Sequence, residues 1–249
     1  MMIFNTRTGR LFFFSTEPRA CSYLPGREAV MLFADPNKAI DSDSYGRLID
    51  YGFRRSGDNV YRPHCRSCME CIPVRIPVAE MELNRTQRRN VKRNGDLEIV
   101  HGVTEFSDEH LELYHRYQQS RHDADTTSQD AEDQLGFLRS KFIETSFLEF
   151  RFDGRLLMVA VIDVVPQGLS AAYTFYDPDY PQRGLGVFGV LTLAEECRQR
   201  ELTWLYLGYW IKDCDKMSYK TMFQPLHAYR DGQWELLQSD DEKALLSES

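Results

Sequence analysis

Apolar positions in the second half of the chain follow the pattern of buried strands. Three such stretches span residues 147–152, 156–165 and 169–176. Short apolar or alternating runs of this kind are typical of strands. Asp153-Gly154, between the first two stretches, is typical of a tight hairpin turn. The pattern therefore predicts antiparallel strands in this half.

Helical patterns flank these strands. We expect one amphipathic helix over about 108–119 and another around 130–145. After the strands, a glycine-containing loop at 180–186 precedes a helix at about 187–200 and a further strand at 204–208. Antiparallel strands followed by a loop, a helix and another strand predict an α+β fold with the layout of an acyltransferase.

The first half contains shorter elements. Residues 1–20 have an extended pattern, 21–26 (CSYLPG) form a loop with Pro25-Gly26 as a turn signal, and 28–34 form a strand. A helix is expected over about 41–52, beginning near Ser42 or Asp43 and ending at Gly52.

Two further elements follow in this half. The alternation at 74–78 predicts a half-buried strand, and Pro73 and Pro77 indicate that it lies at an edge or is irregular. Asn84 can cap a helix that ends at Asn94-Gly95, and a short strand follows at 96–100.

Composition limits the class of protein. No run of about 18 apolar residues is present, so we expect no membrane span. The apolar patch at 11–14 is too short for a signal peptide and is better interpreted as a strand. Six cysteines are few for 249 residues, which favours a reducing cytoplasm over a secreted disulfide scaffold.

Charge is distributed unevenly along the chain. The net charge is −8, yet the segment 51–93 has ten Lys or Arg against four Asp or Glu. A local reversal of this kind can guide a polyanion to one face of a protein. The alternative is an ordinary solvated surface.

Five basic residues are spaced so that they share one face of the predicted helix at 84–94. They are Arg85, Arg88, Arg89, Lys92 and Arg93. Like charges on one stripe repel one another, and a phosphate backbone would relieve that cost. Carboxylates from the acidic second half would relieve it equally.

Other cations suit a smaller anion. Arg54, Arg55 and Arg75 lie near the same segment and are candidates for binding a carboxylate. Lys216 and Lys220, further along the chain, are additional candidates for contact with phosphates.

The cysteines at Cys65, Cys68 and Cys71 have a spacing seen in metal sites, and Cys21 is a candidate fourth ligand. Zinc folds usually contain two complete C-x-x-C pairs. The second partner of Cys21 would be Leu24. Reduced thiols that pack a turn are therefore the favoured interpretation, with zinc as the alternative.

Several stretches together resemble the arginyl-tRNA–protein transferase family. They are CSYLPG at 21–26, YGFRRSGDNVYRPHCRSCMECIPVRIPV at 51–78, RTQRRNVKRNGDL at 85–97, LSAAYTFYDPD at 169–179, GLG at 184–186 and LYLGYWIKDCDKMSYK at 205–220. The resemblance is strongest to the short bacterial branch of leucyltransferases. It implies transfer of leucine from leucyl-tRNA to proteins with N-terminal Asp or Glu, which marks them for degradation.

The resemblance also implies a fold of the acetyl-CoA-dependent N-acetyltransferase (GNAT) type. We expect an N-terminal Cys/Arg-rich α+β subdomain at 1–100, a GNAT-like domain at 101–240 and an acidic tail at 241–249. Relatives outside the bacterial branch hold a metal cluster with a C-x-x-C pair and a Cys-Cys pair. Both pairs are incomplete here, so we expect no required cofactor.

The implied reaction is aminolysis of an activated ester, in which positioning supplies much of the catalysis. Asp177 or Asp179 is the expected proton acceptor or orienting group. Tyr173, Tyr209 or Tyr219 is expected to stabilise the oxyanion or protonate the ribose oxygen. Rival hypotheses are an arginyl-tRNA donor, an acyl-CoA-dependent N-acyltransferase that holds pyrophosphate at 184–186, and a zinc-containing nucleic-acid-binding module.

Overall fold

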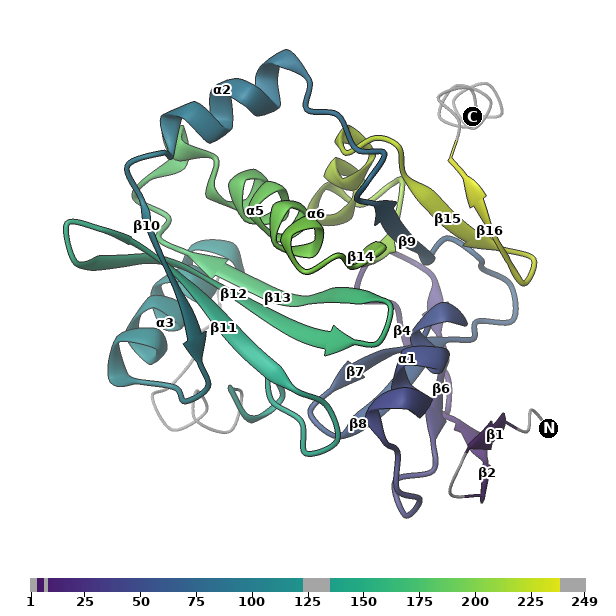
Figure 1. The fold of residues 1–249 in the computed structure, drawn as a ribbon. Coiled ribbons are helices and arrows are strands. Elements are labelled where there is room, and N and C mark those ends of the chain that lie inside the picture. The colour runs from purple at the N-terminus through teal and green to yellow at the C-terminus, as the bar shows by residue number, and fades with distance from the viewer. Residues whose placement is uncertain (1–3, 7–8, 123–134, 238–249) are drawn as a thin grey trace.

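A mixed sheet of eight strands forms the centre of the molecule (Figure 1). The computed structural model describes residues 4–6, 9–122 and 135–237. In order across the sheet, the strands are β10 (Glu98–Val103), β11 (Thr145–Phe152), β12 (Arg155–Val165), β13 (Gly168–Tyr176), β14 (Trp204–Trp210), β9 (Ile72–Pro77), β15 (His227–Arg230) and β16 (Gln233–Leu236).

The three central apolar strands are confirmed as an antiparallel meander. Asp153 and Gly154 both have positive φ, at 48° and 81°, as a tight hairpin turn requires. β12 is apolar on both faces because both are covered: Met158 and Ile162 pack on one side, and Val159 and Val161 pack on the other. The continuous apolar run therefore reflects a doubly buried strand.

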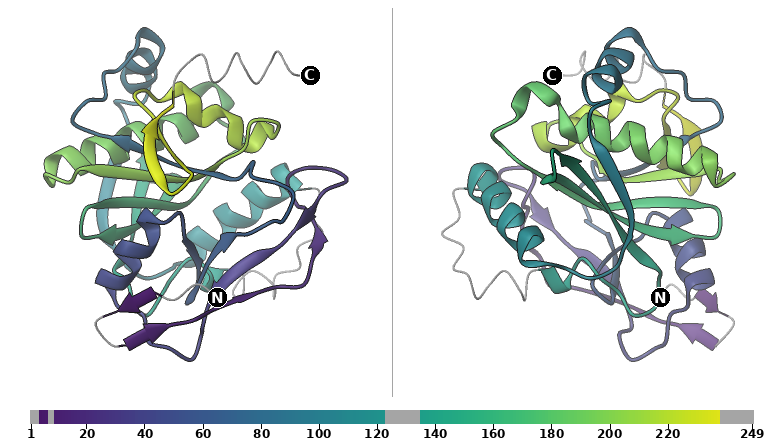
Figure 2. Two further views of the ribbon diagram at one scale, coloured as in Figure 1. Left: turned by 90° about the vertical axis from the view of Figure 1, so that its right-hand side faces the viewer. Right: turned by 60° about the vertical axis from the view of Figure 1, so that its left-hand side comes forward.

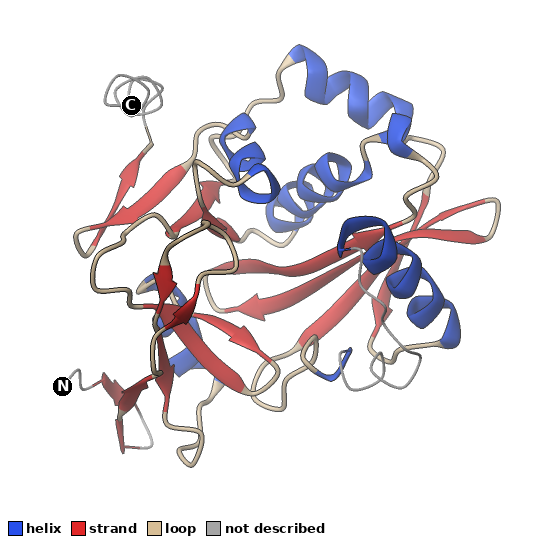
Figure 3. Cartoon of the chain, turned by 180° about the vertical axis from the view of Figure 1, so that it is seen from behind, coloured by secondary structure: helices blue, strands red, loops and turns tan. Residues whose placement is uncertain are grey.

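Helices cover both faces of this sheet (Figure 3). On one face lie α5 (Leu185–Gln199), α2 (Arg85–Arg93) and the short α6 (Asp215–Ser218). On the other face lie α3 (Asp108–His122) and α1 (Ser42–Asp50), and Figure 2 shows α3 and α5 on opposite sides of the strands. Two short 3-10 helices, η1 (Pro181–Arg183) and η2 (Tyr219–Met222), lead into or follow these elements.

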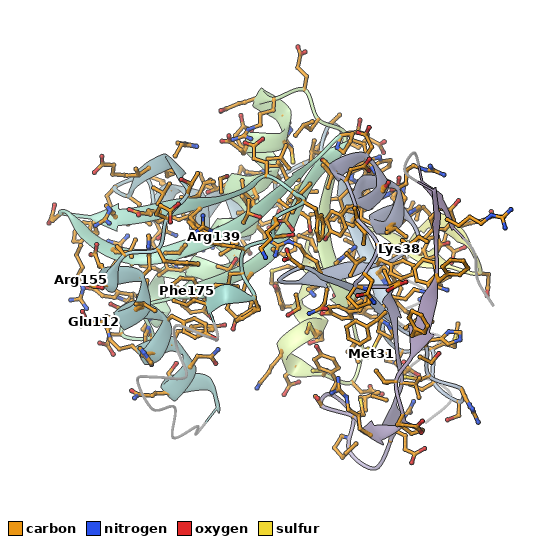
Figure 4. All side chains as sticks on the ribbon, turned by 90° about the horizontal axis from the view of Figure 1, so that it is seen from below. Met31, Lys38, Glu112, Arg139, Arg155 and Phe175 are labelled. Carbon is orange, nitrogen blue, oxygen red and sulfur yellow. The ribbon has the colours of Figure 1, made fainter. Side chains whose placement is uncertain are left out.

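A second, smaller sheet is built from the N-terminal half. Its order is β3 (Phe13–Ser15), β6 (Met31–Ala34), β8 (Asn59–Pro63) and β7 (Arg54–Ser56), all antiparallel. Two-stranded ladders join β1 (Phe4–Thr6) to β2 (Gly9–Leu11) and β4 (Arg19–Ala20) to β5 (Glu28–Ala29). Figure 4 shows Met31 among these N-terminal strands and Phe175 on the large sheet.

The parallel contact between β13 and β14 is short. Pairing covers Gly168–Ser170 against Trp204–Tyr206 and goes no further, so the two strands are not hydrogen-bonded beyond that point. β14 then has a register shift between Tyr206 and Gly208, where Gly208 has φ +78°. A bulge of this kind bends a strand and redirects its side chains.

Most predicted elements are confirmed, with two corrections. β9 is an internal strand between β14 and β15 and not an edge strand, but it is irregular, with a register shift against β14. It is also buried over most of its length and not half-buried. Its prolines are tolerated because β15 pairs only with Val74 and Arg75, so Pro73 and Pro77 lie beyond that pairing. The predicted helix around 130–145 does not extend as expected. Of its described part, 135–136 is helical, 137–144 consists of turns, bends and irregular chain, and β11 begins at Thr145. Residues 130–134 lie outside the described residues.

The predicted division near residue 100 stays a prediction, although β9 and β10 belong to the same sheet as the strands of the second half. Within the described part of the chain, no helix has both the length and the apolar character needed to cross a membrane.

Candidate functional site at the junction of the two sheets

One face of the four-stranded sheet lines a cavity of about 340 Å³. Phe33 and Tyr61 are register partners across β6 and β8, and Tyr61 is in turn the partner of Arg54 on β7. Directly opposed residues project from the same face of a sheet. Phe33 and Tyr61 line the cavity, Arg54 continues their row, and Tyr209 of β14 contributes to the wall.

Arg54 is a buried cation with an unpartnered edge. Arg54 is 8% exposed, and its Nη1 donates to the carbonyl of Phe53. Its Nε and Nη2 are buried without a hydrogen-bond partner among the described residues. The rings of Tyr206 and Tyr209 lie 5.8 and 5.7 Å from its guanidinium carbon. Buried donors without acceptors are costly, so this edge is a candidate for binding an acceptor group of a ligand.

Arg55, the next residue, shows how the Nε–Nη2 edge of an arginine binds a carboxylate. Its Nε and Nη2 grip both carboxylate oxygens of Asp163, at 2.8 and 2.5 Å, and both side chains are buried. Nη2 also donates to Thr145 and to the carbonyl of Leu138. These contacts tie the small sheet to β12. They leave Arg55 little capacity for the predicted carboxylate ligand. In Arg54, the same two nitrogens are buried and have no partner among the described residues.

Arg75 makes several contacts within the protein, although its Nε is also buried without a partner among the described residues. Its guanidinium lies between the rings of Trp204 and Trp234, at 3.6 and 4.1 Å, and its Nη1 donates to Asp50. Asp50 also accepts from Tyr206. We therefore assign Arg75 to the packing of β9, β14 and β16, and do not carry it into the proposed site.

Lys220 lies close to Arg54, and both side chains approach the same side of Gly208. A side-chain carbon at Gly208 would lie 3.7 Å from Arg54 Nε and 4.0 Å from Lys220 Nζ. Lys220 is 6% exposed and donates to the carbonyl of Tyr209. This position corrects the expectation that Lys220 meets phosphates at the surface. Lys216, in contrast, is exposed on α6.

A larger cavity of about 940 Å³ lies on the other side of Tyr209 and Pro63, which line both cavities. Its wall is rich in aromatic rings, including Tyr51, Trp210 and Tyr229. Trp210 is 3% exposed, and its indole N–H is buried without a partner among the described residues. This cavity therefore offers aromatic stacking surfaces to a ligand.

The carboxylates predicted to act as bases are held by arginines. Asp177 is fully buried and accepts hydrogen bonds from Arg116 and Arg155, and Asp179 is ion-paired with Arg116. Burial raises the pKa of Asp177, but the Arg116 hydrogen bond, the Asp179 N–H and the two positive charges outweigh it. The net pKa is lowered from its usual value. A carboxylate held in this way is a poor proton acceptor, so we assign Asp177 a structural role.

The three predicted tyrosines lie in different surroundings. Tyr173 packs between Tyr114, Phe137 and Phe175, under α3. Tyr219 is 40% exposed beside Phe223. Only Tyr209 lines the two cavities, and its hydroxyl donates to the carbonyl of Gly52 at 2.9 Å. Burial raises the pKa of Tyr209 well above its ordinary value, so its hydroxyl stays protonated.

Helix α2 presents its basic stripe to solvent. The five predicted cations are exposed, and none is ion-paired to a carboxylate in the described parts of the chain. The opposite face is polar and buried: Asn90 and Asn94 donate to the carbonyl of Arg183, and Gln87 donates to that of Met222. These amides seat α2 against the loop before α5, which orients the stripe outward.

The glycine loop before α5 serves this packing. Asn90 also donates to the carbonyl of Gly184, and a side-chain carbon at Gly184 would lie 2.8 Å from the Asn90 amide nitrogen. With φ +61°, Gly184 also has the left-handed conformation that glycine favours. The loop glycine is therefore explained without an acyl-CoA ligand.

Three of the four candidate cysteines accept hydrogen bonds from within the protein. Cys21 accepts from the N–H of Leu24, Cys65 from that of Val30, and Cys68 from the side chain of Arg27. Over the residues that the structure covers, no group of three or more His, Cys, Asp or Glu is arranged to hold a metal ion. These contacts support a packed turn. Metal binding by Cys21, Cys65, Cys68 and Cys71 stays a prediction, which metal analysis of the purified protein would test.

Sequence reasoning missed the roles of Gly208 and Trp210. Gly208 follows a strand pattern and gives no local sign of a bulge, apart from being a glycine within an apolar run. Trp210 looks like an ordinary core aromatic, because its unpartnered N–H depends on neighbours from other elements.

The fold and the site define an α+β protein with two separate cationic features, the buried guanidinium of Arg54 beside the cavity-lining Tyr61 and an exposed basic helix. Residues 19–89 match the family described as "Arginine-tRNA-protein transferase, N terminus", and residues 109–230 match its "C terminus". An aspartate/glutamate leucyltransferase of Pseudomonas aeruginosa (strain LESB58) is 46% identical over 92% of this chain and 98% of that protein. One from Marinobacter nauticus is 46% identical over 95% and 99%.

The chain therefore belongs to the arginine-tRNA-protein transferase family, whose members are transferases. Among solved structures, L-PGS from Bacillus licheniformis aligns with a TM-score of 0.41 at 13% identity, over 65% of this chain and 48% of that one. A similarity of this size carries no argument.

Proposed function

We propose that this protein transfers leucine from leucyl-tRNA to the α-amine of proteins that begin with Asp or Glu. The relatives named aspartate/glutamate leucyltransferase, which match nearly the full chain, support both the donor and the acceptors. We further propose that the large sheet with its short parallel contact is a GNAT-type scaffold. The products would enter degradation that depends on the N-terminal residue, in the cytoplasm.

The assignment of the acceptor rests on Nε and Nη2 of Arg54, which have no hydrogen-bond partner among the described residues. Its buried Nε and Nη2 have the geometry with which Arg55 holds Asp163. Bidentate contact of this kind selects a planar carboxylate. The cavity of about 340 Å³, which is lined by Tyr61, the register partner of Arg54, has room for one acidic side chain. A neutral N-terminal side chain would leave the guanidinium unpaired, which accounts for selectivity toward Asp and Glu.

The larger cavity suits the donor. Its volume of about 940 Å³ lies within the range of small-molecule sites and leaves room for a leucyl group on a terminal adenosine. Aromatic rings are suited to stack on a base. The exposed stripe of α2 would bind the phosphate backbone of the same tRNA, with Lys216 as a further candidate.

Tyr209 lies between the two cavities, where the ester and the amine must meet. Since its hydroxyl is bonded to Gly52, we propose that its ring separates and aligns the two substrates. Alignment of an amine with an activated ester supplies much of the required rate, because the reactants are then held together.

A single assay tests donor and acceptor together. The protein is incubated with a peptide that begins with Glu and a pool of mixed charged tRNAs, and the product is weighed by mass spectrometry. We expect the mass of one leucine to be added, and no addition to a peptide that begins with Gln. Addition of arginine would overturn the donor, and product on the Gln peptide would overturn the role of Arg54. No product with any charged tRNA would overturn the proposed function.

A further inference from the structure

Lys220 is a buried lysine without a counter-ion. No carboxylate forms an ion pair with it among the described residues, and the residue is 6% exposed. Its Nζ donates to the carbonyl of Tyr209 and lies 3.3 Å from the sulfur of Met217. Burial of an ammonium with only neutral acceptors disfavours its charged form.

The net effect of the surroundings of Lys220 is to lower its pKa. Burial lowers its pKa most, and the positive charge of Arg54 on β7 lowers it further. Cys214, before α6, opposes this shift, and Tyr209 of β14 presents only its carbonyl. Together they lower the pKa of Lys220 to about 7.

The position of Lys220 fits an acceptor whose side chain is held by Arg54. A side-chain carbon at Gly208 would lie 3.7 Å from Arg54 Nε and 4.0 Å from Lys220 Nζ, so both nitrogens are near one position. In an N-terminal aspartate, the α-nitrogen lies only about 3–4 Å from the carboxyl carbon, given bond lengths near 1.5 Å. When the carboxylate is on Arg54, the α-ammonium group therefore comes within reach of Lys220.

We propose that Lys220 is the base that removes a proton from the acceptor's α-ammonium group, an inference that rests on the proposed transferase function. Neutral Nζ accepts this proton, and the free amine attacks the leucyl ester carbon. As the C–N bond forms and the C–O bond to the ribose breaks, a second nitrogen proton passes to the ribose oxygen. Lys220 then releases its proton to solvent, which leaves an amide and a tRNA with a free hydroxyl.

The test compares Lys220→Met and Lys220→Arg with wild type, and uses Lys38→Met as the matched control on an exposed loop. Single-turnover rates are measured with saturating leucyl-tRNA and a Glu peptide, after circular dichroism confirms folding. We expect both Lys220 variants to lose about 100- to 10,000-fold in rate, as for removal of a general base. Lys38→Met should keep the wild-type rate.

The pH profile separates a base from a structural lysine. The wild-type rate should rise through about pH 7 and then level off. The loss in Lys220→Met should shrink above about pH 8, where the α-amine loses its proton without help. Methylamine added to Lys220→Ala should restore part of the rate.

Three results would overturn the proposal. One is a wild-type rate that stays level between about pH 6 and 8, which is measurable even if the variants do not fold. The second is a Lys220 variant in which only the KM for tRNA is raised, and the third is one in which only the KM for the peptide is raised. In either case Lys220 would be a binding group. Wild type without any product would instead count against the transferase function itself.

Discussion

At the scale of single residues, Arg54 and Arg55 differ in surroundings although they are adjacent in sequence. Their side chains leave opposite faces of β7, because successive residues of a strand alternate. Arg55 pairs with Asp163, whereas Arg54 continues the row of Phe33 and Tyr61 and has two donors without a partner among the described residues. The same side chain is therefore structural at one position and a ligand-binding candidate at the next.

This contrast predicts opposite effects of one substitution. Arg55→Met should lower the free energy of unfolding by about 3–5 kcal/mol, because it leaves Asp163 buried and unpaired. Arg54→Met should leave stability unchanged or raise it, since it removes a buried cation that has no carboxylate partner among the described residues, yet it should abolish the use of Glu peptides. Thermal melts and transfer assays on both variants measure this. A large loss of stability in Arg54→Met would show that Arg54 has an internal partner.

Asp177 gives a second prediction at this scale. Because its folded pKa is lowered, its stabilising contribution is present above its unfolded pKa near 4 and is lost as pH falls through the folded value. Asp177→Asn should therefore lower stability by about 1–3 kcal/mol at pH 7. The difference from wild type should shrink below about pH 4.

Melting temperatures measured from neutral to acidic pH follow this difference. If Asp177 were the catalytic base, Asp177→Asn would melt like wild type at pH 7 and lose its transfer rate alone. Arg151→Gln, which breaks a separate contact to Glu109 and Glu149, is a control for general weakening of the β11–β12 hairpin.

At the scale of elements, α2 combines a docking face and a binding face within nine residues. The asparagine and glutamine side chains on the buried face hold it against α5, and a capping box at Asn84 and Gln87 fixes its start. The mutual repulsion of its exposed cations is not relieved by carboxylates among the described residues. That cost is explained if a polyanion covers the stripe.

Replacing Arg85, Arg89 and Lys92 together by Gln tests this helix. The logarithm of tRNA affinity should depend less steeply on the logarithm of salt concentration, with the slope reduced by about 2–3. Arg139→Gln is the control, since this exposed arginine is paired with Glu105. Filter binding at several salt concentrations measures the slope. An unchanged slope would place the tRNA on another surface.

At the scale of the whole molecule, the two cavities meet at Tyr209 and Pro63. The smaller cavity is lined largely by the N-terminal sheet, and the larger one by β14, the cysteine turn and the β15–β16 hairpin. Neither half of the chain builds this junction alone. Donor and acceptor sites should therefore be separable by mutation.

Trp210→Phe replaces an indole that lines the larger cavity by a smaller ring, and Asn59→Leu changes the polarity of the smaller cavity. We expect Trp210→Phe to raise KM for leucyl-tRNA and Asn59→Leu to raise KM for the peptide, each several-fold, with the other KM unchanged. Steady-state kinetics with each substrate varied in turn measures both. Equal effects on both constants in either variant would show that the cavities do not divide the substrates.

The sequence by itself determined the elements of this protein and its family. Strand and helix periods, the capping residues of α2 and the Asp153-Gly154 turn are local features, because each depends on residues a few positions apart. The basic stripe was predicted for the same reason: its five cations repeat with the helical period.

Only the tertiary structure decided which of the predicted site residues are free to act. It paired Arg55 with Asp163, enclosed Arg75 between two tryptophans, and held Asp177 between two arginines. It also placed Lys220 near Arg54, with both side chains beside Gly208. Burial and the choice of hydrogen-bond partner depend on residues far apart in the chain, so no local pattern distinguishes a buried, unpaired cation from an ordinary surface one.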